Sequence, residues 1–423
     1  MKPFSRRHFV AGSAALLAMP ALVKGAAAAN GARVVIIGGG FGGASVARYL
    51  RRHSPELSIT LIERDSSFVT CPMSNGVLGG LWGIEQVSFG YDGVRAAGIE
   101  VVHDTASGID PDGKTVTLAG GDSLAYDYLV VSPGVQMIWD SIEGYSPETA
   151  EIMPHAWLAG AQTTLLRQQL EAMDDGGLVV IGVPAPPFRC PPGPYERASL
   201  IAHYLKAEKP ASKLMILDAS ESFSKQPLFT QAWDTLYPGI VEWLPASQSG
   251  PVMAVDPATM TVSTGFDDFE AAVANIIPAQ RAGQIAIDAG LDQGQGFCAI
   301  DPVTFESKVH KSIYVLGDAT IAGAMPKSGF SANNQAKACG AAILADIAGT
   351  EFGPGRLINV CYSLAAPEYG FSISDVYRVA DDTLNLSYED NRTTPVGADQ
   401  EIYTDEAAYA HSWYETITTE MFG

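Results

Sequence analysis

The side chains of this 423-residue chain best suited to redox chemistry are five cysteines: Cys71, Cys190, Cys298, Cys339 and Cys361. Cys71 lies in "TCPMSN", and no second cysteine follows within three residues, so it is not half of a CxxC pair. It could be a small core hydrophobe, half of a distant disulfide, or a residue bonded to a cofactor. Five cysteines are too few for a disulfide scaffold in a chain of this size, and the odd number leaves at least one outside any disulfide.

The other four cysteines fall into two groups. Cys298 ("GFCAI") and Cys339 ("AKACGAAI") lie in apolar segments, and we predict that both are packing residues. Cys190 lies in "FRCPPGPYER" and Cys361 in "INVCYSLAAPEYG". What these two can do depends on the elements that carry them.

The first of these elements is a nucleotide-binding pattern. An apolar strand over 34–37 is followed by a glycine motif, a helix over 44–52 and a second strand that ends at Glu63. The glycines have the spacing GxGxxG: Gly38, Gly40 and Gly43. They let the backbone approach a pyrophosphate at the start of the helix, and Glu63 can accept hydrogen bonds from ribose hydroxyls. The pattern predicts a site for NAD or FAD.

Two later segments favour FAD. "YDYLVVSPG" (126–134) is a strand that enters a Pro-Gly turn, and "KSIYVLGDAT" (311–320) is a strand that ends in Gly317-Asp318. This arrangement resembles the two-dinucleotide-fold flavoproteins of the disulfide-reductase type. The resemblance implies that Asp318 binds the ribityl and phosphate part of FAD.

The same resemblance implies an α/β fold with two Rossmann-like domains and a C-terminal α+β interface domain. The FAD-binding domain would be split between residues 33–150 and 275–345. The second nucleotide-fold domain would cover 151–274, and the interface domain 346–423. The interface domain would cover the flavin or form a dimer contact.

The second nucleotide unit departs from a working nicotinamide site. A strand over 178–182, a helix over 196–205 and a strand that ends at Asp218 repeat the first pattern. Starting the motif at Gly182, however, the other two glycine positions are Pro184 and Pro187. Proline has no N–H to donate to a pyrophosphate. We therefore expect this domain to keep its fold without binding NAD(P)H.

The N-terminus is predicted to be an export signal. Residues 1–28 contain Arg6-Arg7, an apolar run and a small-residue cleavage site, which indicates twin-arginine export to the periplasm; an ordinary Sec signal is the alternative. The formal net charge is −21, and loss of the signal, with four basic and no acidic residues, makes it −25. Such a surface repels nucleic acid and anionic membrane and suits a basic partner.

Five segments together resemble the flavoprotein subunit of flavocytochrome c sulfide dehydrogenase, or the closely related flavoprotein of the Sox sulfur-oxidation system. They are "TCPMSN", "RCPPGPYERAS", "VLGDA", "INVCYSLAAPEYG" and "SWYETITTEMFG". The resemblance implies that Cys71 carries FAD through an 8α-methyl thioether and that Cys190 and Cys361 form a redox disulfide. Glu196 matches the active-site carboxylate of the family, and Trp413 an aromatic residue near the flavin ring. Pro72-Met73 departs from the Tyr-Leu-like pair expected after Cys71.

The chemistry implied is oxidation of sulfide to sulfur or polysulfide. Hydrosulfide can attack a disulfide to give a persulfide and a thiolate, and Glu196 could act as general base. Alternatively, Glu196 is an ordinary carboxylate in the first turn of a helix. Electrons would pass to a separate c-type cytochrome, because the chain has no CxxCH for a haem of its own. No metal site is predicted.

Two other functions remain as alternatives. A sulfide:quinone oxidoreductase-like enzyme should have an amphipathic C-terminal segment for the membrane, whereas the C-terminal segment here is acidic. The third possibility is a non-catalytic accessory flavoprotein of sulfur oxidation that keeps FAD as a structural group.

Overall fold

The computed structural model describes residues 31–387, 389 and 391–423. The export signal predicted at residues 1–28 lies outside this part of the chain. Within the described residues, no helix is long and apolar enough to cross a membrane.

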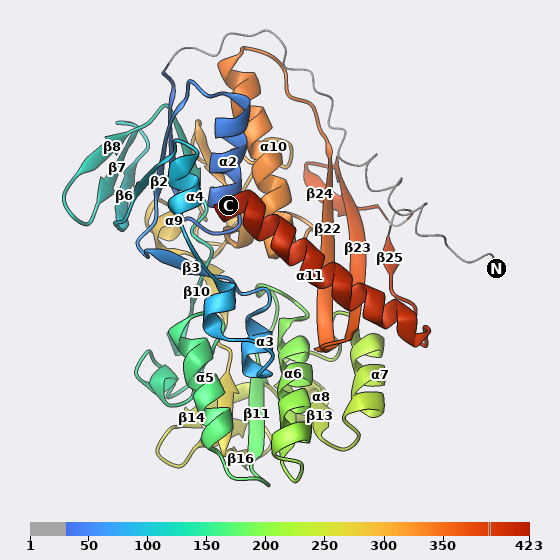
Figure 1. Ribbon diagram of the computed structural model, residues 1–423. Helices are drawn as coiled ribbons and strands as arrows, with labels where there is room; N and C mark the ends of the chain where they lie inside the picture. Colours follow the sequence, from blue (N-terminus) through green and yellow to red (C-terminus); the bar gives the residue numbers. More distant parts are fainter. Residues whose placement is uncertain (1–30, 388, 390) are drawn as a thin grey trace.

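The first nucleotide unit is built on a five-stranded parallel sheet with the order β20-β9-β1-β2-β5. Strands far apart in sequence pair here, because β20 lies beside β9. Helices α2 (Gly43–His53) and α10 (Gly329–Ile347) pack against each other in the upper half of Figure 1. The strands are β1 (Arg33–Ile37), β2 (Ser58–Ile62), β5 (Glu100–Val102), β9 (Tyr128–Val131) and β20 (Ile313–Val315).

The second nucleotide unit occupies the lower half of Figure 1 and has a four-stranded parallel sheet, β13-β12-β11-β17. Its apolar strands, such as "LVVIGV" in β11, are buried on both faces, as expected of a parallel sheet covered by helices. The strands are β11 (Leu178–Val183), β12 (Lys213–Asp218), β13 (Val241–Leu244) and β17 (Val273–Ile276). The helices are α5 (Ala161–Ala172), α6 (Gly193–Glu208), α7 (Gln226–Leu236) and α8 (Ala246–Ser249).

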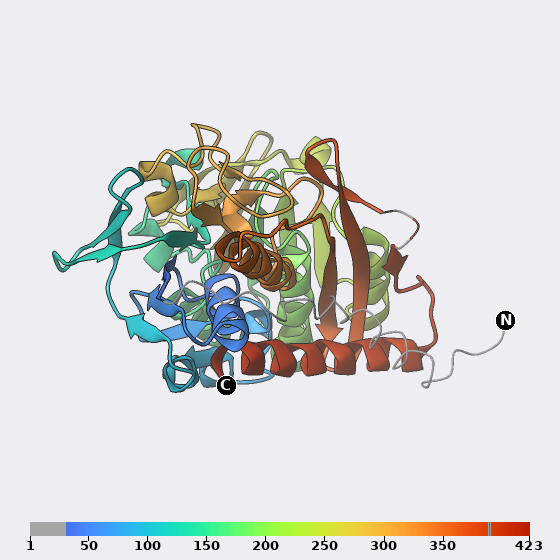
Figure 2. The ribbon, with the colours of Figure 1, turned by 90° about the horizontal axis from the view of Figure 1, so that it is seen from above.

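The C-terminal part forms an antiparallel sheet from β22 (Arg356–Ala366), β23 (Tyr369–Ala380), β24 (Thr383–Leu386) and β25 (Arg392–Thr393). Helix α11 (Gln400–Phe422) runs along this sheet and on to α2 and α4, as Figure 2 shows. Strand β22 contacts α6 of the second unit and α10 of the first. The sheet therefore joins both nucleotide units, and the predicted fold class is confirmed.

Short elements complete the chain. Two three-stranded antiparallel sheets comprise β6 (Ala106–Asp110), β7 (Thr115–Leu118) and β8 (Ser123–Ala125), and β14 (Val252–Asp256), β15 (Thr261–Thr264) and β16 (Asp268–Glu270). Two-stranded pairs are β3 (Ser67–Val69) with β4 (Ser88–Gly90), β10 (Val135–Met137) with β18 (Gln280–Ala282), and β19 (Cys298–Ala299) with β21 (Thr320–Ile321). The short helices are α3 (Ser74–Leu78), α4 (Asp92–Ala96) and α9 (Gln284–Asp288).

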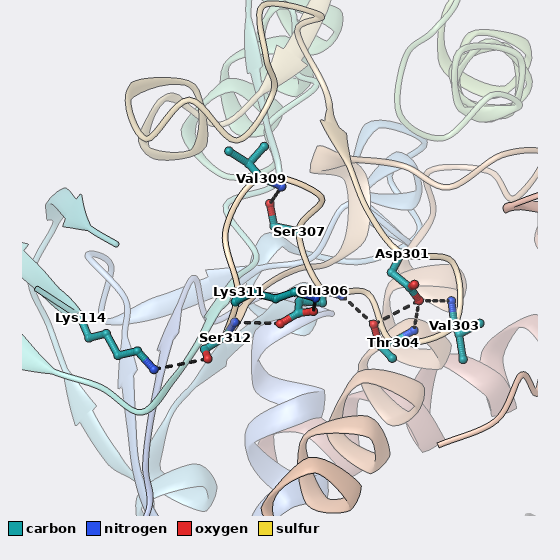
Figure 3. Close-up of polar contacts among 9 residues, drawn as sticks. All are labelled: Lys114, Asp301, Val303, Thr304, Glu306, Ser307, Val309, Lys311 and Ser312. Atoms are coloured by element: carbon teal, nitrogen blue, oxygen red, sulfur yellow. Dashed lines mark hydrogen bonds and ion pairs between the residues drawn. The ribbon is translucent and has the colours of Figure 1, made fainter. Parts of the chain in front are cut away.

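A loop network holds the strand that leads to Gly317-Asp318 (Figure 3). Asp301 Oδ1 accepts hydrogen bonds from the backbone N–H groups of Val303 and Thr304, both at 2.9 Å. Glu306 accepts from Ser312 N at 2.8 Å and from Lys311 Nζ at 2.7 Å. The bond from Ser312 N fixes the residue immediately before β20, the strand that leads to the predicted flavin-binding aspartate.

Two sequence predictions about the core can be compared directly with the structure. Cys298 and Cys339 are fully buried in the main hydrophobic cluster, which confirms their packing role. The strand expected over 311–320 is shorter, because β20 ends at Val315 and Gly317–Ala319 forms a 3₁₀ turn. Gly317 adopts a φ of 70°, which ends the extended backbone there.

Candidate active site

The first glycine turn packs closely on its own fold. A Cβ on Gly38, which has a φ of 94°, would lie 2.3 Å from the Ser132 carbonyl oxygen, and one on Gly43 would lie 1.8 Å from that of Gly38. Glu63, which follows β2, accepts from Gly39 N at 2.7 Å and from Asp65 N at 3.1 Å. Glu63, the predicted ribose acceptor, therefore also holds the glycine turn in place through its bond to Gly39 N.

The surroundings of Asp318 indicate what kind of group could bind there. Its Oδ1 atom is buried and has no hydrogen-bond partner among the described residues. Burial raises the pKa of Asp318, while the charges of Arg189 and Lys327 oppose the increase. A buried carboxylate oxygen without a partner requires a donor, and the sugar-alcohol hydroxyls of FAD are donors. The residues present thus fit the cofactor that the sequence predicts.

Cys71 lies between β3 and α3 in a polar setting. Its Sγ accepts from Arg189 Nη2 at 2.8 Å and lies 3.5 Å from the Trp157 carbonyl oxygen, which Arg189 also contacts. The residue is half-buried. These polar contacts differ from the apolar packing of Cys298 and Cys339.

Cys190 and Cys361 are brought together from the second unit and the C-terminal sheet. The pKa of the Cys190 thiol is raised well above its usual value, first by burial and then by charge on Cys361 and Glu196. The three groups therefore share one electrostatic environment. Both cysteines are free thiols in this structure. The disulfide between them stays a prediction.

Glu196 is held in the first turn of α6 by partners from two distant segments. Its Oε1 accepts from Leu364 N on β22 at 2.9 Å, and its Oε2 accepts from Asn75 Nδ2 at 3.0 Å. Burial raises the pKa of this carboxyl, and the hydrogen bonds limit the increase. The carboxyl is therefore more readily protonated than an ordinary exposed helix carboxylate, which suits a group that exchanges protons.

Sequence reasoning missed the polar residues that orient Glu196. Arg197 is buried and donates to Asn75 Oδ1 at 3.1 Å and to Asn275 Oδ1 at 2.8 Å. It also donates to the carbonyl oxygens of His155 and Ala156, at 2.9 and 2.6 Å. The signal in the sequence was the charged "YER" that ends the second glycine-like turn. Asn75, fixed by Arg197, in turn fixes the Glu196 carboxylate.

Lys225 was also missed, and it lies directly on Cys361. Its ammonium is 3.5 Å from Cys361 Sγ and donates to the Cys361 carbonyl oxygen at 2.7 Å. No sequence motif marks this lysine, because the contact joins residues 136 positions apart.

Left-handed backbone conformations gather at this site. Non-glycine residues with positive φ are uncommon, and they cluster where the surrounding structure holds functional groups in place. Four of the positive-φ residues lie on the segments that surround the cysteines: Met73 (φ 68°), Ala156 (φ 44°), Cys190 (φ 55°) and Lys225 (φ 62°).

Trp413 is placed on α11, beside the strand that carries Cys361. Its ring stacks on Phe330 with centroids 6.0 Å apart and lies 6.0 Å from the ring of Tyr362. It also packs with Met73 against the apolar cluster around Tyr414. The predicted aromatic residue thus lies between the loop of Cys71 and the strand of Cys361.

A pocket of about 440 Å³ opens at the second turn. Residues on both sides of Cys190 line it, together with apolar side chains of neighbouring loops; they include Pro187, Phe188, Pro191, Phe223, Phe297 and Lys327. Burial lowers the pKa of Lys327 to about 8. Cys190 is not among the lining residues, but Phe188 and Pro191 on either side of it are, so the pocket lies at the loop that carries this cysteine.

Sequence and structure comparisons agree on the class of protein. Residues 32–182 match the family described as pyridine nucleotide-disulphide oxidoreductase. The fold is that of the sulfide:quinone oxidoreductase of Aquifex aeolicus, with a TM-score of 0.72, 20% identity and 92% of each chain covered. It is also that of an NAD-dependent persulfide reductase from A. fulgidus, with a TM-score of 0.60, 17% identity, and 89% of this chain and 77% of that chain covered. The chain is a flavin-binding oxidoreductase of this two-domain type.

More specific matches follow the second unit and the C-terminal sheet. Residues 163–278 match "Sulfide dehydrogenase (flavocytochrome c) flavoprotein chain, central", and residues 354–422 match "Flavocytochrome c sulphide dehydrogenase, flavin-binding". The chain is 62% identical over 45 residues to the sulfide dehydrogenase flavoprotein chain of Chlorobaculum thiosulfatiphilum, covering 11% of this chain and 94% of that sequence. It belongs to the family of flavocytochrome c sulfide dehydrogenase flavoprotein chains, which confirms the resemblance seen in the motifs.

A sulfide-quinone reductase of Aquifex aeolicus is 34% identical over 174 residues, which is 41% of this chain and 39% of that protein. The chain thus aligns with about two fifths of that relative's length.

Proposed function

We propose that this protein oxidises sulfide to sulfur or polysulfide through a disulfide between Cys190 and Cys361. The observation that carries the proposal is the position of Glu196. Its Oε1 accepts from Leu364 N on the strand of Cys361 at 2.9 Å, while Gly193 N at the start of the same helix donates to the Cys190 carbonyl oxygen at 2.8 Å. Cys190, Cys361 and Glu196 come from a loop, a strand and a helix of different units. Such a combination of two thiols and a buried carboxyl has no evident structural purpose.

The protein's own residues account for the first step. Hydrosulfide attacks one sulfur of the disulfide, so that a new S–S bond forms, the Cys190–Cys361 bond breaks, and the electron pair leaves on the other sulfur. Glu196 takes the proton of the bound sulfide, for which its raised pKa suits it. The pocket beside Cys190 is the route by which the small substrate reaches the disulfide. FAD, when bound, supplies a two-electron acceptor.

Several residues would hold that cofactor. The glycine turn of Gly38, Gly40 and Gly43 would lie at the pyrophosphate, and Asp318 would accept from the sugar-alcohol chain. Cys71 would carry the cofactor covalently through an 8α-methyl thioether. Arg189, 2.8 Å from Cys71 Sγ, would hold the position of the sulfur.

The partner and compartment belong to the same proposal. Electrons would leave one at a time to a separate c-type cytochrome in the periplasm, after twin-arginine export of the folded flavoprotein. The net charge of −21 would suit a basic cytochrome surface. Replacing Arg6 and Arg7 by lysine and assaying cell fractions tests the export; periplasmic protein in that variant would contradict it.

The decisive test of the activity is flavin bleaching by micromolar sulfide in the absence of NADH. We expect wild type to bleach and Cys361→Ser to lose bleaching while it retains flavin. Cys298→Ala, which alters a buried cysteine of the core, serves as the control and should bleach normally. An unchanged visible spectrum of the wild-type protein after sulfide addition would refute the activity.

Covalent attachment needs a separate measurement. After denaturing precipitation and gel electrophoresis, flavin fluorescence should stay with the wild-type polypeptide and disappear in Cys71→Ser. Fluorescence that persists in Cys71→Ser would exclude this cysteine as the attachment point.

A quinone is the second candidate acceptor, because the chain is 34% identical over 174 residues to a sulfide-quinone reductase. Sulfide-dependent reduction of a soluble quinone and of a c-type cytochrome should be compared at equal enzyme concentration. Faster reduction of the cytochrome supports the first proposal, and faster reduction of the quinone supports the second.

A further inference from the structure

Lys225 occupies an unusual position for a lysine. It precedes α7 in a left-handed conformation with a φ of 62°, and only 8% of its surface is exposed. From there its side chain reaches across to β22. Its ammonium donates to the Cys361 carbonyl oxygen and to Ser363 Oγ, both at 2.7 Å, and lies 3.5 Å from Cys361 Sγ. Two of its protons are thus used by neutral groups, and the third faces the sulfur.

Among the described residues, no carboxylate lies within ion-pair distance of this buried ammonium. Its charge acts at longer range on Glu196 and Asp375, where it opposes the increase in pKa that burial causes. The hydrogen bonds of these two acids go to other groups, to Leu364 N and Asn75 and to the Tyr377 hydroxyl and Asn391. A buried cation without a direct ion-pair partner is a candidate for a functional role.

The two cysteines have different surroundings. The Lys225 ammonium lies 3.5 Å from Cys361 Sγ. Burial and the charges of Cys361 and Glu196 raise the pKa of Cys190, and the smaller effects of Arg189 and Lys225 oppose this increase. Both cysteines are half-buried, so access by itself predicts no difference in their reactivity. The ammonium in contact with Cys361 Sγ can stabilise negative charge that develops on this sulfur when an S–S bond breaks.

We propose that Lys225 is the counter-ion of a Cys361 thiolate and thereby makes Cys361 the leaving sulfur when the disulfide is opened. The inference rests on the proposed function. In the step, hydrosulfide forms a bond to Cys190 Sγ, the Cys190–Cys361 bond breaks, and its electron pair stays on Cys361 Sγ beside the ammonium. Cys190 then carries the persulfide, and no further oxidant or reductant enters this step.

The test measures thiol reactivity without sulfide. Reduced protein is treated with iodoacetamide for increasing times, and alkylation at each cysteine is followed by peptide mass spectrometry. In wild type we expect Cys361 to react about tenfold faster than Cys190. Lys225→Gln keeps a hydrogen-bond donor but removes the charge, and should slow Cys361 about tenfold. It should slow Cys190 much less, because Lys225 is only the smallest of the charge effects on that thiol. Lys225→Arg keeps the charge and should retain most of the Cys361 reactivity.

Two results would overturn the proposal. One is an unchanged Cys361 rate in Lys225→Gln; the other is an equal slowing of both cysteines, which would indicate a structural disturbance. If Lys225→Gln does not fold, the ratio of the Cys361 to the Cys190 alkylation rate in wild type is the test. Equal rates at the two cysteines would refute Cys361 as the leaving sulfur.

Sulfide bleaching of the same proteins separates this inference from the proposed function. If wild type does not bleach, the proposed activity fails while the alkylation result still stands. If wild type and Lys225→Arg bleach and Lys225→Gln is at least tenfold slower, both proposals are supported. Normal bleaching in Lys225→Gln would remove Lys225 from the reaction.

Discussion

The two nucleotide-fold units of this protein differ most at the turn between their first strand and first helix. In the first unit, β1 ends at Ile37 and α2 begins at Gly43 after a tight glycine turn. In the second, β11 ends at Val183 and α6 begins only at Gly193, after a longer proline-rich loop. That loop carries Arg189 and Cys190. The same βαβ framework thus presents backbone N–H groups in one unit and reactive side chains in the other.

The two units also differ in the acidic residues at the start of the first helix and at the end of the second strand. The first turn of α2 has no acidic residue, which leaves the positive end of the helix for a phosphate, whereas the first turn of α6 carries Glu196. Asp218, at the end of β12, is buried and accepts from the Tyr195 hydroxyl at 2.6 Å and Trp243 Nε1 at 2.9 Å. Asp218 stands where an acid would bind a ribose in a working nucleotide site, but its carboxylate is already hydrogen-bonded to Tyr195 and Trp243. The turn and its neighbours therefore decide what a nucleotide fold binds.

The largest effect should come from adding a methyl group to the first turn. In Gly43→Ala the new Cβ would lie 1.8 Å from the Gly38 carbonyl oxygen, which is backbone and cannot move aside. We expect a loss of about 4 kcal/mol or more and no bound flavin. In Gly182→Ala, at the first motif position of the second unit, the Cβ meets a Val252 side-chain methyl at 3.0 Å, and the expected loss is about 1 kcal/mol. Thermal unfolding measures the stability of both variants, and the visible spectrum measures their flavin content. Equal losses of stability in the two variants would contradict the proposed difference between the two turns.

Replacing the carboxylate of the second helix should have the next largest effect. Glu196→Gln should slow sulfide bleaching about 100-fold. Burial raises the pKa of Glu196, so in wild type the basic form is lost, and the rate falls, as the pH is lowered through that raised value. The glutamine variant should lack this acidic limb. Glu208→Gln, at the exposed end of the same helix, should behave as wild type. An acidic limb that survives in Glu196→Gln would assign the proton to another group.

The two acids at the strand ends should respond in opposite ways. Asp218→Ala leaves the Tyr195 and Trp243 donors without an acceptor and should cost about 2 kcal/mol of stability without loss of flavin. Glu63→Ala should release flavin at a smaller cost in stability, because its partners are backbone N–H groups at a partly exposed turn. Chemical denaturation and flavin content after gel filtration distinguish the two. Flavin loss in Asp218→Ala would contradict the prediction that Asp218 is structural and Glu63 binds the flavin.

The smallest effect is expected from restoring glycine to the second turn. The double variant Pro184→Gly and Pro187→Gly should show no flavin reduction by NADH, because Asp218 remains bound to Tyr195 and Trp243. Anaerobic mixing with NADH, followed in the visible spectrum, measures this. NADH-dependent bleaching in the variant would show that the prolines alone exclude the nicotinamide.

Much of the fold could be predicted because its signals are local. The β1-turn-α2 pattern, the second β-turn-α unit and the strand before Asp318 each lie within a short segment, and their periodicity indicates strand or helix directly. Of the site, Cys71, Cys190, Cys361 and Glu196 could be named because the motifs around them are unusual. Asn75 and Arg197 lie inside these motifs, but the hydrogen bonds that join Asn75 to Glu196 and to Arg197 connect distant segments and were not predicted. Lys225 lies outside every motif.

By itself, the sequence determined the two nucleotide folds and the glycine and proline turns, since backbone sterics and hydrophobic periodicity act over a few neighbouring residues. The candidate reactive residues were named through the resemblance of their motifs to a known family. Only the tertiary structure decided which charges face which thiols. Leu364 N meets Glu196 across 168 positions, and the Lys225 ammonium meets Cys361 across 136. The pKa of a buried group depends on burial and on charges within a few ångströms, and these are set only when distant elements pack together.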